Sequence, residues 1–183
     1  DNVKIAPVES STEYGLKETA LKLLSDKDAV AGVNADFFGL KGNYSASFGP
    51  VIADGELVSV GTDKNLTSKE YASFFVSDTG KSFIDYLTFT ADFVNDAGAR
   101  LELASINKIT DLTYPMYFNS SAASSTADID KRISGLMKLV VEDDTITYIS
   151  SVGETVQCPM GDGYIIIVKG TYADYAAQNF KVG

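Results

Sequence analysis

Residues 29–39 read Ala-Val-Ala-Gly-Val-Asn-Ala-Asp-Phe-Phe-Gly. The first five are small or β-branched apolar residues, a pattern that predicts a buried strand over residues 29–33. The polar residues Asn34 and Asp36 follow at its end, which is a common way to hold chemistry on a rigid support. The structural alternative is that an Asx-turn closes the strand while Phe37 and Phe38 pack in the core.

The segments before this stretch predict a β-α-β opening. A first strand is expected over residues 3–8. Residues 15–24 place Leu16, Ala20, Leu23 and Leu24 at the spacing of one helix face. A helix between two strands is typical of a right-handed crossover between parallel strands.

Three pairs of apolar runs flank turn sequences and predict β-hairpins. The strongest signal is Asp54-Gly55, which lies between residues 51–53 and 56–60. The other two hairpins pair residues 73–77 with 83–93, and 133–141 with 145–150.

The second half of the chain is expected to be rich in strands. Strands are predicted at residues 101–109, 114–119 and 163–169, a Ser- and Ala-rich loop at 119–128, and a closing helix at 172–178. The predicted fold class is therefore α+β, a mixed sheet with few helices and several hairpins. The change in pattern near residue 100 divides the chain into residues 1–98 and a smaller β-rich unit over residues 99–183.

Composition excludes several classes of function. The chain of 183 residues has a formal net charge of -10, no histidine and one cysteine. An acidic chain repels nucleic-acid phosphates, and the missing histidine excludes Ser-His-Asp and Cys-His catalysis. The single Cys158 lies among apolar neighbours and is expected to be buried rather than nucleophilic. We expect no metal, no cofactor and no membrane insertion, since no segment approaches the roughly 20 apolar residues of a membrane span.

Four stretches, in order along the chain, resemble a known family. Residues 31–38 (Ala-Gly-Val-Asn-Ala-Asp-Phe-Phe) are similar to the Ala-Gly-Ile-Asn-Gly-Gly/Asp-Phe-Phe signature of phosphodiester glycosidases. That family includes the mannose 6-phosphate uncovering enzyme, an N-acetylglucosamine-1-phosphodiester hydrolase, and many bacterial cell-surface proteins. Residues 47–58 resemble the family's Gly-Pro-Val-Ile-x-Asp-Gly-x-Leu hairpin, and residues 106–108 and 159–166 resemble later landmarks of the bacterial members.

The resemblance implies hydrolysis of a sugar-1-phosphodiester, with Asp36 as the catalytic acid or base or as the acceptor for a sugar hydroxyl. Asn34 would bind the substrate, because its amide both donates and accepts hydrogen bonds. Phe37, Phe38 and Gly49 complete the substrate-binding set that the resemblance implies, and the alternative for the two phenylalanines is packing beneath the loop.

The sequence departs from the family pattern in its later part. The His-Pro-Arg and Asp-Gly-Gly-Gly-Ser-Ser segments of the family are not found in these residues. We therefore expect the N-terminal portion of a hydrolase with an inserted β-rich unit, truncated at its C-terminus and inactive by itself. The alternatives are a non-catalytic carbohydrate-binding or cell-surface module and a purely structural domain.

The resemblance also predicts where the protein acts and on what. A secreted or cell-surface location is expected, with a sugar-phosphate or polysaccharide ligand related to the cell wall or to exopolysaccharide. An unpaired sheet edge would in addition allow an edge-strand dimer.

Overall fold

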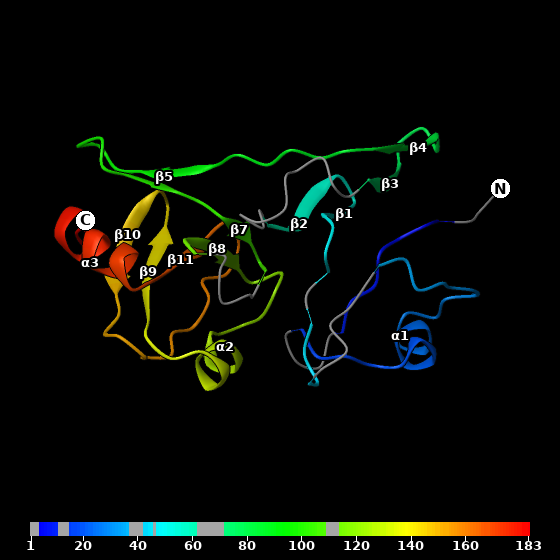
Figure 1. The fold of residues 1–183 in the computed structure, drawn as a ribbon, viewed down its shortest axis with the longest axis horizontal. Coiled ribbons are helices and arrows are strands. Elements are labelled where there is room, and N and C mark those ends of the chain that lie inside the picture. Colours follow the sequence, from blue (N-terminus) through cyan, green and yellow to red (C-terminus); the bar gives the residue numbers. More distant parts are fainter. Residues whose placement is uncertain (1–3, 11–14, 37–41, 46, 62–71, 109–113) are drawn as a thin grey trace.

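A mixed sheet runs through the computed structural model of the chain (Figure 1). The structure describes residues 4–10, 15–36, 42–45, 47–61, 72–108 and 114–183. Within these ranges the sheet has seven strands in the order β1-β2-β7-β8-β11-β9-β10. The bounds are β1 Val51–Ala53, β2 Glu56–Gly61, β7 Ser105–Ile106, β8 Met116–Asn119, β9 Leu136–Glu142, β10 Thr145–Ile149 and β11 Tyr164–Lys169. The β7–β8 pair is parallel and the other neighbours are antiparallel.

Small hairpins and helices complete the described part of the chain. One two-stranded sheet pairs β3 (Ser73–Val76) with β4 (Ser82–Asp85), and another pairs β5 (Asp92–Val94) with β6 (Arg100–Glu102). The helices there are α1 (Ala20–Asp26), α2 (Ala127–Arg132) and α3 (Thr171–Asn179). The predicted α+β class is confirmed.

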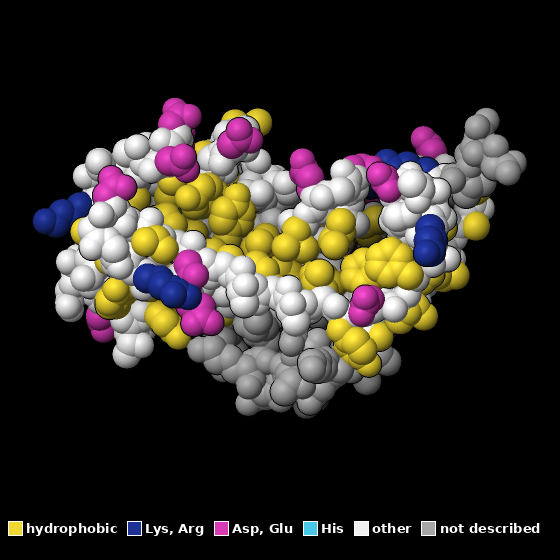
Figure 2. All heavy atoms as spheres, turned by 90° about the horizontal axis from the view of Figure 1, so that it is seen from above, with side chains coloured by type: hydrophobic (Ala, Val, Ile, Leu, Met, Phe, Trp, Pro, Cys, Tyr) yellow, Lys and Arg dark blue, Asp and Glu magenta, His cyan; other side chains and the backbone are white. Residues whose placement is uncertain are grey.

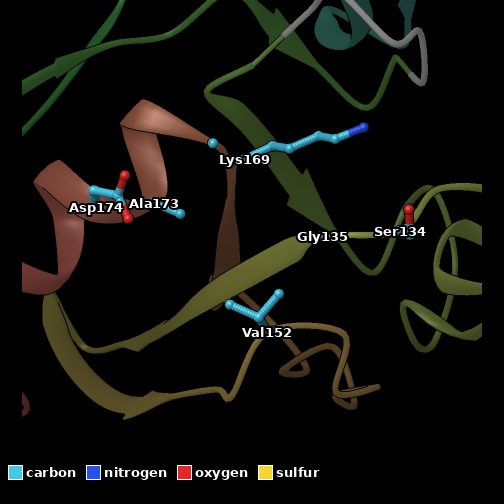
Figure 3. Close-up of a pocket in the computed structure, with 7 residues that line it drawn as sticks. Ser134, Gly135, Val152, Lys169, Ala173 and Asp174 are labelled. Atoms are coloured by element: carbon cyan, nitrogen blue, oxygen red, sulfur yellow. The ribbon is translucent and has the colours of Figure 1, made fainter.

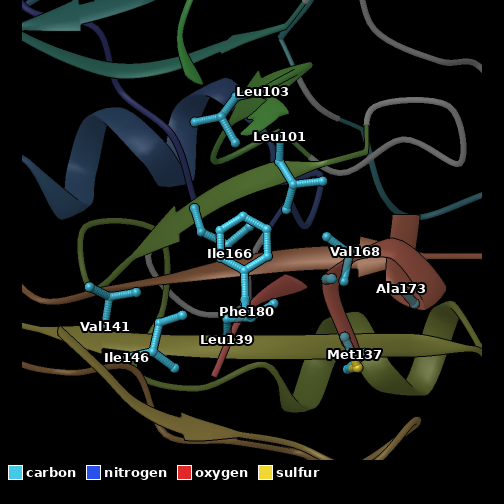
Figure 4. Packing of buried hydrophobic residues seen from close by; sticks show 11 residues of the cluster. Leu101, Leu103, Met137, Leu139, Val141, Ile146, Ile166, Val168, Ala173 and Phe180 are labelled. Atoms are coloured by element: carbon cyan, nitrogen blue, oxygen red, sulfur yellow. The ribbon is translucent and has the colours of Figure 1, made fainter. Parts of the chain in front are cut away.

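The core lies on both faces of β9 and β11. Alternate residues of these strands face two apolar clusters, which explains their almost unbroken apolar sequences. One cluster packs beneath α3 and consists of Leu101, Leu103, Met137, Leu139, Val141, Ile146, Ile166, Val168, Ala173, Ala176 and Phe180 (Figure 4). The other packs beneath α2 and includes Met116, Phe118, Ile129, Ile133, Leu136, Val140, Cys158, Ile165 and Ile167. The prediction that Cys158 is buried is confirmed.

The predicted turns form where the sequence placed them. Asp54 and Gly55 have φ angles of 52° and 85° and join β1 to β2. Asp143 and Asp144, with φ of 48° and 56°, join β9 to β10 in the same way. Positive φ at both central residues gives a turn whose twist matches that of paired strands. The strand pairings confirm the hairpins at 51–60, 73–85 and 136–149, the second with a shorter return strand than predicted.

The strand predicted at residues 29–33 is wrong. Val30 and Val33 are 95% and 88% exposed, and the chain there is irregular. After α1, whose first turn is capped by Thr19, the chain reverses, and the backbone N–H of Ala29 donates to the carbonyl of Leu24 at 2.9 Å. A Cβ on Gly32 would lie 2.2 Å from Leu24 Cδ2, so the segment folds back against the helix. Of the predicted β-α-β opening, only a helix forms. In the first predicted strand, residues 4–8 are irregular, and residue 3 lies outside the described ranges.

The strand predicted at residues 101–109 is split because the chain changes neighbours. The backbone N–H of Leu103 donates to Ala91, next to β5, whereas that of Ala104 donates to Pro115, next to β8. Strands β6 and β7 therefore belong to different sheets. Helix α2, at the end of the predicted 119–128 loop, was not predicted.

Strands β2 and β7 join the two halves of the chain. Val60 pairs with Ile106 and Gly61 with Ser105, which links residues on either side of the predicted boundary at residue 98. The division into two units stays a prediction.

Figure 2 shows apolar side chains gathered in a hollow of the upper face. No helix in the part of the chain that the structure describes is long and apolar enough to cross a membrane.

Candidate functional site

The Asp36 carboxylate holds the loop that precedes β1. Its Oδ2 accepts a hydrogen bond from the backbone N–H of Phe48 at 2.7 Å and one from that of Gly49 at 3.2 Å. Bonds from amides to an ionised carboxylate are among the stronger hydrogen bonds in proteins. Asp36 therefore positions the loop of residues 47–49, which we call the 47–49 loop.

Lys108 holds the same loop through a backbone carbonyl. Its ammonium Nζ donates to the carbonyl of Phe48 at 2.6 Å. Lys108 is buried, and its methylene stem passes over β2, where a Cβ on Gly61 would lie 2.9 Å from Lys108 Cδ. A glycine at position 61 thus lets the lysine reach the loop.

Asn34 forms the Asx-turn that was the structural alternative for this segment. Its side-chain Oδ1 accepts from the backbone N–H of Asp36 at 3.4 Å, and the residue is exposed. This turn leads the chain into Asp36. Phe37 and Phe38 lie outside the described residues.

Gly49 lies at a close approach between the 47–49 loop and its neighbours. A Cβ there would lie 3.3 Å from Ser73 Oγ. The hydroxyl of Ser47 also lies 3.4 Å from that of Ser59, which is buried on β2. Packing of the loop against β2 and β3 accounts for a small residue at position 49.

Asn107, which directly follows β7, is hydrogen-bonded to both β2 and β8. Its Nδ2 donates to the carbonyl of Val58 at 2.8 Å and to Asn119 Oδ1 at 2.9 Å. Its Oδ1 accepts from the backbone N–H of Asn119 at 3.0 Å. Asn107 has φ of 47°, which asparagine tolerates better than most residues. It fixes the position from which Lys108 extends.

Glu9 brings a second carboxyl group into electrostatic range. Desolvation raises the pKa of the Glu9 carboxyl, the Lys108 ammonium partly opposes this shift, and the charge of Asp36 adds to it. Glu9 is an exposed residue, and the two charges that act on its carboxyl group are those of Lys108 and Asp36. The pattern of residues 3–8 did not point to Glu9.

The hydrogen bonds bring together segments that are distant in the sequence. Residues 34–36, 47–49 and 107–108 meet through Asp36, Phe48 and Lys108. The fourth stretch that carries the family resemblance, residues 159–166, includes the start of β11. There Tyr164 pairs with Asn119, the hydrogen-bond partner of Asn107. The resulting site offers carboxyl, amide and ammonium groups, which suit a ligand that carries hydroxyl and anionic oxygens.

A separate surface pocket lies beside α3. It has a volume of about 410 Å³ and is lined by Ser134, Gly135, Val152, Lys169, Gly170, Ala173 and Asp174 (Figure 3). None of the predicted site residues belongs to it. Within the described ranges, no group of three or more acidic or cysteine side chains is arranged to hold a metal ion.

Comparisons of the chain with protein-family models, curated proteins and solved structures found no match.

Proposed function

We propose that the 47–49 loop and its neighbours form the sugar-phosphate pocket of a phosphodiester glycosidase. The observation that carries this proposal is the meeting of three segments. Residues 34–36, 47–49 and 107–108 each carry part of the resemblance to that family, and hydrogen bonds of Asp36 and Lys108 join them. Residues that share one ligand must converge in space, and nothing in the sequence spacing required these to do so.

The residue types suit the proposed ligand. Lys108 supplies a cation for the phosphate, and Asn34 supplies an amide for phosphate oxygens or sugar hydroxyls. The carboxyl groups of Asp36 and Glu9 accept bonds from sugar hydroxyls. In the hydrolysis, water adds across the bond between sugar and phosphate, which releases the sugar and leaves a phosphomonoester.

The role of Asp36 in that reaction is open to two interpretations. As catalytic acid or base it would exchange a proton with the substrate. Its contacts with two backbone amides instead favour a positioning role, which also fits a non-catalytic carbohydrate-binding module. We retain binding without catalysis as the second candidate function, on this observation.

Secretion or display at the cell surface, and a ligand derived from cell-wall or exopolysaccharide sugars, belong to the same proposal. An edge-strand dimer through β1 or β10 is also proposed, because these strands end the sheet among the described residues.

Calorimetric titration with three ligands tests the proposal. N-acetylglucosamine 1-phosphate is expected to bind, whereas N-acetylglucosamine and inorganic phosphate alone bind more weakly, because each satisfies only half of the site. Equal binding of phosphate and sugar phosphate would contradict a sugar-specific pocket, and absence of binding would contradict the pocket itself.

A hydrolysis assay tests whether the residues present are sufficient for catalysis. A methyl phosphodiester of N-acetylglucosamine 1-phosphate is offered to the same 183-residue chain. We expect binding without turnover, because the family's His-Pro-Arg and Asp-Gly-Gly-Gly-Ser-Ser segments are not found in these residues. Measurable turnover would instead establish hydrolysis by the residues present and exclude the binding module.

A further inference from the structure

A lysine and an aspartate meet inside the apolar cluster beneath α2. Lys138 lies on β9 between Leu136 and Val140, at a position that otherwise faces this cluster. Its side chain has no exposed area, and that of Asp130 on α2 is only 8% exposed. The Lys138 ammonium contacts Asp130 Oδ1. Burial of an ion pair in such surroundings removes the hydration of both ions at considerable cost.

The second carboxylate oxygen of Asp130 is held by two hydroxyl groups. Thr126 Oγ1 donates to Oδ2 at 2.7 Å, and Thr155 Oγ1 donates to it at 3.1 Å. Thr126 Oγ1 in turn accepts from the backbone N–H of Val156 at 3.1 Å, which directs its own hydrogen toward Asp130. Paired donors of this kind stabilise the negative charge that develops on an oxygen when a nucleophile attacks its carbon.

We propose that Lys138 and Asp130 condense to form an intramolecular amide bond between Nζ and Cγ. The ammonium first passes a proton to Oδ1, which leaves a neutral amine beside a carboxylic acid. The amine nitrogen attacks Cγ, and Oδ2 carries the developing charge between Thr126 and Thr155. A second proton moves from nitrogen to Oδ1, the Cγ–Oδ1 bond breaks, and one water molecule leaves. No oxidant, reductant or further reactant is needed.

The hydrogen bonds of the product are already present around the two side chains. The amide oxygen, derived from Oδ2, keeps both threonine hydroxyls as donors. The remaining N–H of the amide keeps the carbonyl of Glu154, which already accepts from the Lys138 ammonium. Condensation therefore removes two buried charges and leaves no polar atom of the pair without a partner.

A neighbouring ion pair provides the contrast. Lys131 and Asp128 on the same helix lie 3.1 Å apart, but the Lys131 side chain is 71% exposed. Water solvates this pair, so no condensation is expected.

The mass of the intact, denatured 183-residue protein tests the proposal. The expected mass is that of the sequence less one water molecule, with a cross-linked peptide in the digest that joins the segments of Asp130 and Lys138. A folded protein with the full sequence mass would overturn the proposal. So would a water loss that maps elsewhere, for example to a cyclised aspartate before glycine.

Three variants make the assignment specific. Lys138→Met is expected to show its full calculated mass, and Lys131→Ala to keep the water loss. Asp130→Asn is expected to lose ammonia instead of water and so to reach the same final mass as the condensed wild type. Water loss in Lys138→Met, or its disappearance in Lys131→Ala, would contradict the bond. The wild-type mass decides the question even where a variant fails to fold.

Discussion

The carboxylate Oδ2 of Asp36 accepts a hydrogen bond from the backbone N–H of Phe48 at 2.7 Å. This contact spans twelve positions of the sequence and ties the end of the 29–39 stretch to the loop before β1. The same loop is held by Lys108 through the Phe48 carbonyl. The two charged side chains thus hold the same short segment. Asp36 accepts hydrogen bonds from its amides, and Lys108 donates one to its carbonyl.

Asp36→Ala is expected to lower the free energy of unfolding by about 1–3 kcal/mol, because two backbone amides lose a charged acceptor. Asp36→Asn keeps a carbonyl acceptor and should cost less. Urea unfolding measures both. Asp96→Ala, at an exposed carboxylate, serves as the control and should change the free energy by less than about 0.5 kcal/mol. Equal effects of Asp36→Ala and Asp96→Ala would contradict the role of Asp36.

Lys108→Met is expected to weaken binding of N-acetylglucosamine 1-phosphate by roughly tenfold or more, since a charge-assisted contact to phosphate is lost. Asn34→Ala should weaken this binding less, because it removes only the hydrogen bonds of one side-chain amide. The matched controls are Lys181→Met and Asn43→Ala, which change exposed residues of the same types. Calorimetry gives the dissociation constants. Unchanged affinity in Lys108→Met, with a retained fold by circular dichroism, would remove Lys108 from the site.

Glu9→Gln is expected to raise the free energy of unfolding at pH 7. The pKa of Glu9 in the folded chain is raised above 4.5, chiefly by desolvation, so the charged form is disfavoured by folding. The contribution of Glu9 is fully favourable below pH 4.5 and is lost as the pH rises through the folded value. The difference between variant and wild type should therefore disappear below pH 4.5. A difference that is constant with pH would show that charge is not its cause.

Cys158 is expected to resist alkylation in the folded protein. Burial raises the pKa of its thiol from 9.0 to about 11, which lowers the reactive thiolate fraction at pH 8 about 100-fold. Iodoacetamide labelling followed by mass spectrometry should be slower by at least that factor in buffer than in urea. The same shift predicts that stability falls as the pH rises from 9 toward 11, and that Cys158→Ala flattens this slope. Equal labelling rates in buffer and urea would contradict it.

Local signals in the sequence were sufficient where a short segment determines its own structure. Asp54-Gly55 dictates a two-residue turn, and the apolar run of β11 fits a strand buried on both faces. The run at residues 29–33 has similar composition but no strand beside it among the described residues, so it folds against Leu24 of α1. Composition alone does not distinguish these two outcomes, because a strand is completed by partners elsewhere in the chain.

The candidate site was only partly predictable for the same reason. Asn34 and Asp36 follow an apolar run, and polar residues at such a position indicate a site. Lys108 lies in a stretch that carries part of the family resemblance, but its partner Phe48 is sixty positions away, and no local pattern predicted that contact. Glu9 lies in an irregular segment without periodicity. Tertiary contacts and electrostatics place both residues at the site.

Mapping of backbone amide shifts by NMR during titration with N-acetylglucosamine 1-phosphate tests the central claim most directly. We predict shifts concentrated at residues 34–36, 47–49 and 107–108, with little change around Lys169 and Asp174 in the pocket beside α3. Shifts confined to that pocket, or no shifts at saturating ligand, would contradict the claim that these three segments form one sugar-phosphate site.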